Sequence, residues 1–261
     1  MTKNKKMKWP ENLSDEERIQ KAKELTDILV DHARALLPVQ ANAQHIVYSS
    51  SLANQIPMSY AANAFITLQY SVHFFLLVRL CAIWDSGAID RESILTVHAL
   101  INTPQIKKKI VEDICQWHLD DRQFHPNSAD DTEIFRAELS LDQKNAQQPS
   151  ETIEGKTTQW LEDVTTRIEK ANTRYVDKKL KANRDMFIAH NLALAVGHKQ
   201  FPEKIKYGDE KPLLAETIKI ITLLHRVLNN ADFDWDKAKK QTDRNAEQLW
   251  SNCTFSIQNK H

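Results

Sequence analysis

The chain has 261 residues, which is enough for one large helical domain or two small ones. Gly is scarce, with 4 residues, and Pro reaches 8, so a protein rich in tight β-turns is hard to build from this composition. Lys plus Arg and Asp plus Glu both total 35, which gives a formal net charge of zero. Binding to nucleic acid therefore requires a local basic patch, because the chain has no overall positive field.

The three cysteines, Cys81, Cys115 and Cys253, are odd in number and far apart. The sequence contains no Cys-x-x-Cys pair, so it predicts neither a disulfide framework nor a cysteine-rich zinc site. Reduced thiols are typical of cytoplasmic proteins, and no apolar signal core follows the Lys-rich N-terminus. We therefore expect a cytoplasmic protein.

Residues 61–78 include no formally charged side chain, and 18 residues is the length at which a transmembrane helix becomes a candidate. The stretch contains Asn63, Gln69 and His73, however, and polar groups are costly inside a bilayer. Arg79 follows it directly. The sequence therefore favours a buried helix of a soluble protein that does not enter a membrane.

The first half of the chain predicts four helices. Ser14 and Glu17 form a capping box, and the apolar stripe that follows is expected to end at Pro38. A second helix begins near Pro57 and runs to residue 84; because it is apolar nearly all round, we expect it to be the central helix of a bundle. A short helix covers residues 93–101, and Thr103 with Pro104 opens another.

The second half begins with residues 120–150, where the periodicity is lost and a flexible insertion is predicted, with a possible short helix over 133–141. A long helix is expected from about residue 157 to 196, and Gly197 ends it. Another follows with Pro212 near its first turn, then a polar helix over 235–250 and a loosely ordered tail. The prediction is an all-α bundle of five or more helices, forming a single domain over 1–261.

One segment, from Arg184 to His190, is chemically suggestive. Arg174, Lys178 and Lys181 precede Arg184 at roughly helical spacing, and this basic strip is a candidate for contact with RNA phosphates. On a regular helix, six residues separate Arg184 from His190 by about 120° and about 9 Å. A kink, the length of the arginine side chain or a second subunit is therefore needed to bring both groups to one phosphate.

The residue types at this segment suit metal-free RNA chemistry. The Arg184 guanidinium offers a permanently charged fork of donors to a phosphate, and the His190 imidazole exchanges protons near neutral pH. Asp185 can orient either group through a hydrogen bond. The alternative interpretation is that His190 is an interior histidine on an apolar strip and Arg184 a solvated surface charge.

Residues 183–190 resemble the Arg-polar-x4-His signature of the HEPN superfamily (higher eukaryotes and prokaryotes nucleotide-binding). Residues 75–85, followed by Ser93 and Ile94, resemble its abortive-infection U-type branch. The resemblance covers roughly residues 61–229. It implies a small helical bundle, commonly a homodimer, in which Arg and His of both subunits line one cleft and cut RNA without a metal or other cofactor.

On this resemblance, Arg184 contacts the scissile phosphate, His190 transfers a proton and Asp185 occupies the polar position after the arginine. It implies a ribonuclease of phage defence or a toxin, with RNA as substrate and possibly an antitoxin as neutralising partner. The superfamily also has non-catalytic members, so a helical binding or dimerisation module is the alternative function.

Three further groups of polar or charged residues have weaker functional interpretations. Residues His118, Asp120, Asp121 and His125 are irregularly spaced, so solvated side chains are favoured over a metal site. Lys107, Lys108 and Lys109 are expected on the exposed face of a helix, with phosphate binding as the alternative. Arg79 and Asp85 are expected to form a charge pair.

Overall fold

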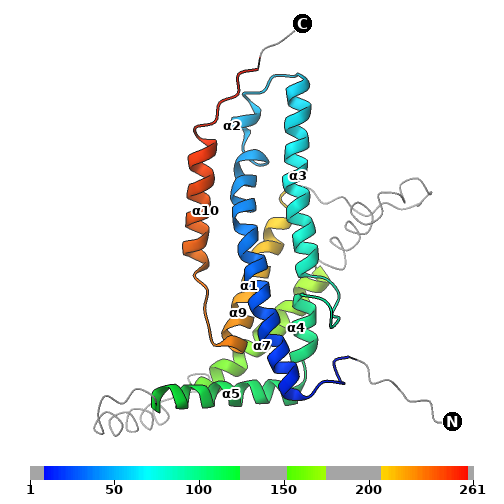
Figure 1. Cartoon of the computed structure of the whole chain (residues 1–261), viewed down its shortest axis with the longest axis vertical. Helices are drawn as coiled ribbons and strands as arrows, with labels where there is room; N and C mark the ends of the chain where they lie inside the picture. The colour runs from blue at the N-terminus through cyan, green and yellow to red at the C-terminus, as the bar shows by residue number, and fades with distance from the viewer. Residues whose placement is uncertain (1–8, 124–151, 175–206, 258–261) are drawn as a thin grey trace, which may run out of the picture. The chain divides into compact units, whose positions relative to one another are not determined.

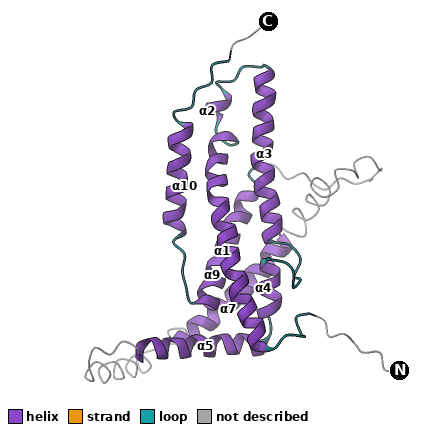
Figure 2. Ribbon diagram, viewed as in Figure 1, coloured by secondary structure: helices purple, strands orange, loops and turns teal. Residues whose placement is uncertain are grey.

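The structure is a computed structural model that describes residues 9–123, 152–174 and 207–257 (Figure 1). Within these ranges the regular structure is helical and contains no strand (Figure 2). The all-α prediction of five or more helices is therefore confirmed. The helices are α1 (Asp15–Ile46), α2 (Ser50–Ala53), α3 (Tyr60–Ile83), α4 (Ile94–Ile101), α5 (Pro104–Gln123), α7 (Ile153–Ala171), α9 (Glu210–Asn229) and α10 (Trp235–Trp250).

The chain divides into two compact units, each assembled from segments that are distant in sequence. Unit 1 takes in residues 1–27, 86–169 and 220–232, whereas unit 2 takes in residues 28–85, 170–219 and 233–261. Helices α1 and α9 each contribute one part to unit 1 and the other part to unit 2. A single domain over 1–261 remains a prediction.

Unit 1 contains a helix cap that the sequence predicts, at the start of α1, and another that it does not, at the end of α4. The backbone N–H of Ser14 donates to Glu17 at 2.8 Å and that of Glu17 donates to the Ser14 hydroxyl at 3.2 Å, which completes the capping box of α1. The guanidinium of Arg18 is buried and donates to the carbonyls of Leu100 at 3.0 Å and Ala99 at 3.4 Å. These carbonyls belong to the last turn of α4, which has no intrahelical donor for them. The unit 1 core includes Ile19, Leu25, Val97, Leu100, Ile106, Ile110, Leu161, Val164, Ile168, Ile221 and Leu224.

Pro38 does not end the first helix, so this prediction was wrong. Helix α1 continues for two more turns to Ile46, although a proline cannot donate the hydrogen bond that its position requires. The apolar stripe also continues, because Leu37, Ala41 and Ile46 are all buried. Burial of this stripe offsets the loss of one backbone hydrogen bond, since most helix stability in proteins comes from packing.

In unit 2, α1 lies between α3 and α10 (Figure 1). The Gln69 amide on α3 donates to the carbonyl of Ile46 at 2.8 Å. The Trp250 indole at the end of α10 donates to Asn42 on α1 at 2.7 Å. The tail that follows α10 was predicted to be loosely ordered, but its described part packs against α3. The Phe255 ring contacts the Phe65 ring edge to face, with 5.9 Å between ring centroids. The unpredicted short helix α2 joins the same apolar cluster.

Helix α3 differs from the predicted central helix in its burial. It begins at Tyr60, capped by Ser59, and buries one face through Phe65, Leu76 and Leu80. Its other face is exposed, which corrects the expectation of a helix buried all round. By length and composition α3 is long and apolar enough to cross a membrane, with 33% of its most apolar window buried. One such helix is weak evidence for a span, because the core helix of a soluble protein passes the same test.

The remaining predicted boundaries are partly tested. Helix α7 begins a little earlier than expected, and its predicted continuation to residue 196, with the Gly197 stop, lies outside the described residues. The predicted helix over 133–141 also lies outside them. Helix α9 has Pro212 in its first turn, and α10 has the predicted bounds with Asp234 as its N-cap.

Candidate functional site

The structure describes only one of the predicted site residues. Arg174 is exposed just beyond the end of α7, as a residue that contacts RNA must be. Lys178, Lys181, Arg184, Asp185 and His190 lie outside the described residues, so their arrangement remains a prediction. The described chain resumes at Tyr207, and both Arg174 and Tyr207 belong to unit 2.

Tyr207 packs against aromatic residues of α3. Its ring centroid is 4.6 Å from that of His73, with the rings at 70°, and 6.0 Å from that of Tyr70. Phe74 extends the group, with its centroid 6.4 Å from that of Tyr70. Edge-to-face and tilted contacts in this range are favourable. Tyr207, the first described residue after the range 175–206, is therefore held on α3.

Beside this contact lies a partly buried polar group that we name the Glu210 cluster, formed by Tyr48, His73, Gly208 and Glu210. The Glu210 carboxylate accepts hydrogen bonds from the Tyr48 hydroxyl and, at 3.0 Å, from the Gly208 backbone N–H. The His73 Nδ1 atom is 3.7 Å from Glu210 Oε2, which is too long for a hydrogen bond. The side chains of His73 and Glu210 are only 6% and 2% exposed.

Burial controls the protonation of Tyr48 and His73. It raises the pKa of Tyr48, and the hydrogen bond to Glu210 raises it further, so the phenol keeps the proton that it donates. Burial lowers the pKa of His73, against the opposing effect of the negative charges of Glu210 and Asp209. His73 is therefore neutral at neutral pH, and its Nδ1 atom is buried without a hydrogen-bond partner. The cluster fastens the first turn of α9 to α3 and to the chain after α1.

We expect the free energy of unfolding to fall as the pH drops below about 6.5, the ordinary pKa of histidine. There the unfolded chain takes up a proton at His73 that the folded protein resists, whereas above that pH the histidine is neutral in both states. The loss is at most about 1.4 kcal/mol per pH unit for one histidine. Urea denaturation at about pH 7.5 and about pH 5.5 measures it.

Two variants separate the sources of this pH dependence. His73→Gln should reduce the loss of stability on acidification. His98 has a pKa that is also lowered by burial, so the double variant His73→Gln/His98→Gln should reduce the loss further. A loss of unchanged size in both variants would contradict the assignment.

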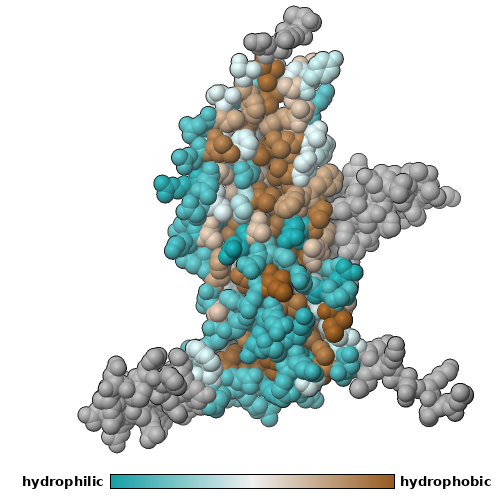
Figure 3. Space-filling view, in the orientation of Figure 1, coloured by the Kyte–Doolittle hydropathy of each residue, from teal (hydrophilic) through white to brown (hydrophobic). Residues whose placement is uncertain are grey.

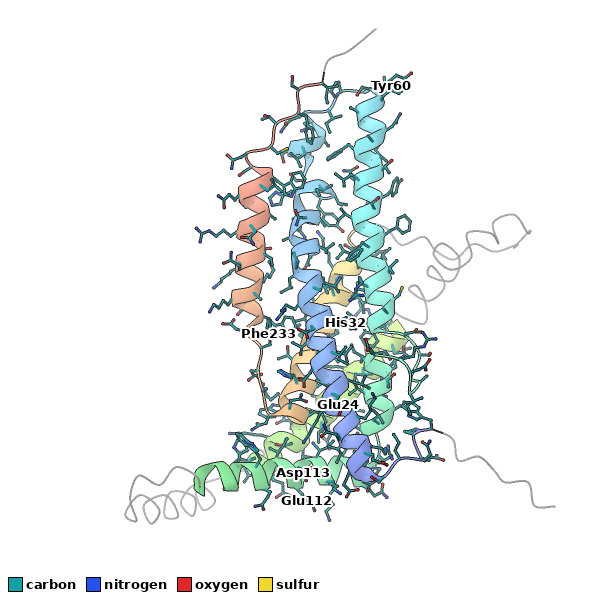
Figure 4. The ribbon with its side chains drawn as sticks, in the orientation of Figure 1. Glu24, His32, Tyr60, Glu112, Asp113 and Phe233 are labelled. Carbon is teal, nitrogen blue, oxygen red and sulfur yellow. The ribbon has the colours of Figure 1, made fainter. Side chains whose placement is uncertain are left out.

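The other predicted groups show ordinary surface contacts. Lys109 pairs with Glu16, and Lys108 lies 3.6 Å from Glu112. In the described ranges no group of three or more His, Cys, Asp or Glu side chains is placed to hold a metal ion, and His125 falls outside them. Nη2 of Arg79 lies 2.8 Å from Nδ1 of His32. Figure 4 labels His32 on α1.

Sequence reasoning missed the Glu210 cluster. Its members come from three separate segments, and no local spacing connects Tyr48, His73 and Glu210. One signal was available: His73 is a titratable residue inside an otherwise uncharged, apolar run. Such a residue has to find a polar neighbour or remain neutral when the helix packs.

Comparison with known proteins identifies the family. The family model described as AbiU2, of HEPN type, matches residues 22–249, and this range includes the segment from Arg184 to His190. No curated protein and no solved structure matches the chain. The match covers most of the chain and confirms the resemblance drawn from residues 183–190 and 75–85. The chain therefore belongs to the AbiU2 family of HEPN proteins.

Proposed function

We propose that this protein is a metal-independent endoribonuclease of the HEPN type that acts in phage defence by abortive infection or as a toxin in the cytoplasm. The family match supports the proposal, because it spans the segment in which Arg184 and His190 have the residue types and order of the HEPN signature. An antitoxin or other neutralising partner is part of the toxin form of the proposal.

In the proposed reaction, Arg184 binds the scissile phosphate and stabilises the charge that develops on its oxygens. His190 transfers one proton, either from the attacking ribose 2′-hydroxyl or to the leaving 5′-oxygen, and water transfers the other. The new bond joins the 2′-oxygen to phosphorus, and the bond to the 5′-oxygen breaks. Asp185 orients one of the two groups, and no metal takes part.

Substrate binding requires more than these two residues. Arg174, Lys178 and Lys181 would neutralise phosphates along the RNA. The affinity for RNA should therefore fall as the salt concentration rises. The exposure of Arg174 supports this role. Six residues of regular helix do not align Arg184 with His190, so the proposal includes a homodimer in which each copy contributes to one cleft.

Cleavage of single-stranded RNA by the purified protein in excess chelator tests this proposal. We expect fragments to accumulate with the wild type but not with the double variant Arg184→Ala/His190→Ala, purified in the same way to control for contaminating nuclease. The proposal fails if the wild type leaves RNA intact, or if the double variant cuts at the wild-type rate.

A second candidate is a non-catalytic binding module of the same fold. The formal net charge of zero favours it, because a polyanion would find little overall attraction. The two candidates differ in filter binding of RNA at low and moderate salt. The ribonuclease should bind RNA with an affinity that falls as salt rises, whereas a protein-binding module should retain no RNA at either salt concentration.

A further inference from the structure

The exposed face of α3 has a composition that is rare on the surface of a monomer. Six large apolar side chains of this helix are between 39% and 51% exposed. No residue from Tyr60 to Val78 has a formal charge. Side chains along the upper part of α3 are mostly brown or pale in Figure 3. Contiguous apolar patches of this kind mark interaction surfaces. The six are Ile66, Leu68, Tyr70, Phe74, Phe75 and Val78.

The face consists of two neighbouring ridges with a four-residue spacing. The large ridge is formed by Ile66, Tyr70, Phe74 and Val78. The small ridge is formed by Asn63, Thr67 and Ser71, and Phe75 continues the same row at its end. Ridges of this spacing on two helices pack into each other's grooves. A large ridge beside a small one is self-complementary, because a two-fold axis sets the large ridge of each copy over the small ridge of the other.

The two hydroxyl groups on the small ridge do not oppose burial. The Thr67 hydroxyl donates to the carbonyl of Asn63 at 3.0 Å, and the Ser71 hydroxyl donates to the carbonyl of Thr67 at 2.9 Å. Each hydroxyl therefore already has a hydrogen-bond partner within the helix, so covering it leaves no unpaired donor. The absence of charge between Tyr60 and Val78 also means that two copies do not repel each other across the axis.

The area is sufficient for a dimer. An aromatic side chain has roughly 150–250 Å² of surface and an aliphatic one less, so the five large apolar residues of the two ridges, about half exposed, offer roughly 400 Å² per copy. Two copies then bury about 800 Å² of these side chains, and the exposed small ridge raises the total toward the ~1,000 Å² that a specific interface needs.

We propose that the exposed face of α3 is the surface through which two copies of this chain form a homodimer. This inference deepens the proposed function. The interface itself is argued from α3, and only the role of the dimer in RNA cleavage rests on the proposed function. Tyr207 contacts Tyr70 of the large ridge, and it is the first described residue after the range 175–206, which contains Arg184 and His190. A second copy seated on α3 would therefore lie beside Tyr207.

Sedimentation velocity over a range of concentrations tests the proposal. The wild type should sediment as a dimer, whereas Phe74→Glu in the large ridge and Ser71→Trp in the small ridge should sediment as monomers. Leu249→Glu is the matched control, because Leu249 is an apolar residue 58% exposed on α10, and this variant should remain a dimer. Phe74→Ala, which adds no charge, should raise the dissociation constant at least tenfold.

A monomeric wild type would overturn the proposal, and so would a dimer that persists in Phe74→Glu and Ser71→Trp. Circular dichroism must give both variants the wild-type helix content; if either is unfolded, Phe74→Ala decides between the outcomes. The same variants distinguish failure of the α3 interface from failure of the proposed ribonuclease. A wild-type dimer that dissociates in Phe74→Glu but never cuts RNA supports the α3 interface and contradicts only the ribonuclease. A ribonuclease that remains dimeric in Phe74→Glu contradicts only the interface.

Discussion

Replacing His190 with alanine is expected to slow RNA cleavage by about 10²–10⁴-fold, the usual contribution of a positioned general acid or base. Replacing Arg184 with alanine should cost about 10²–10³-fold, because the developing phosphate charge loses one fixed cation. Single-turnover cleavage of a fluorescently labelled RNA in chelator measures both rates. The reaction of the wild type should also depend on pH near neutrality, where an imidazole changes its protonation state.

The two variants are distinguishable from each other and from general damage. Arg184→Ala should weaken RNA binding as well as cleavage, whereas His190→Ala should leave binding nearly unchanged. Arg244→Ala and His45→Ala are matched controls, because Arg244 is exposed on α10 and His45 pairs with Glu247 at 3.5 Å. Controls that lose as much activity as the site variants would remove the site assignment.

The fold was largely predictable because its signals are local. Ser14 with Glu17, and Thr103 before Pro104, act within one helical turn, and both of these predicted caps are formed in the structure. The prediction that the first helix ends at Pro38 was wrong. The local effect of Pro38 is one lost hydrogen bond, whereas packing by Leu37 and Ala41 keeps the helix intact. A sequence states the local cost but not the tertiary contacts that offset it.

Exposure on α3 and the Glu210 cluster were beyond sequence reasoning for another reason. An apolar side chain such as Phe74 gives the same sequence pattern whether it packs in a core or against a partner. The sequence of α3 therefore does not indicate which of its faces packs against the rest of the chain. The contact between Tyr48 and Glu210 joins residues 162 positions apart in sequence, and no periodicity relates them. Arg184 and His190 were found by motif, and their geometry stays a prediction.

Replacing Trp84 with alanine is expected to lower the free energy of unfolding by about 3–5 kcal/mol, the cost typical of a buried aromatic residue. Trp84 is 1% exposed and follows directly after α3, and its indole N–H donates to the Thr217 hydroxyl of α9 at 2.8 Å. Truncation removes the largest fully buried side chain of the described core and leaves a cavity that the surrounding helices cannot fill. Total stability is typically about 5–15 kcal/mol, so this variant should be only marginally folded. Urea denaturation followed by circular dichroism measures the change.

A graded series separates the cavity from the hydrogen bond at this position. Trp84→Phe retains most of the volume and should cost about 1–2 kcal/mol, so it stays measurable even if Trp84→Ala fails to fold. Thr217→Val leaves the indole N–H buried without an acceptor and should cost about 1–3 kcal/mol. The double variant Trp84→Phe/Thr217→Val should then cost less than the sum of the two, because the bond can be lost only once.

Trp117→Ala is the matched control: Trp117 is 47% exposed on α5, so its loss should cost less than about 1 kcal/mol. Equal losses in Trp84→Ala and Trp117→Ala would contradict the central packing role of Trp84, and strict additivity in the double variant would contradict its bond to Thr217.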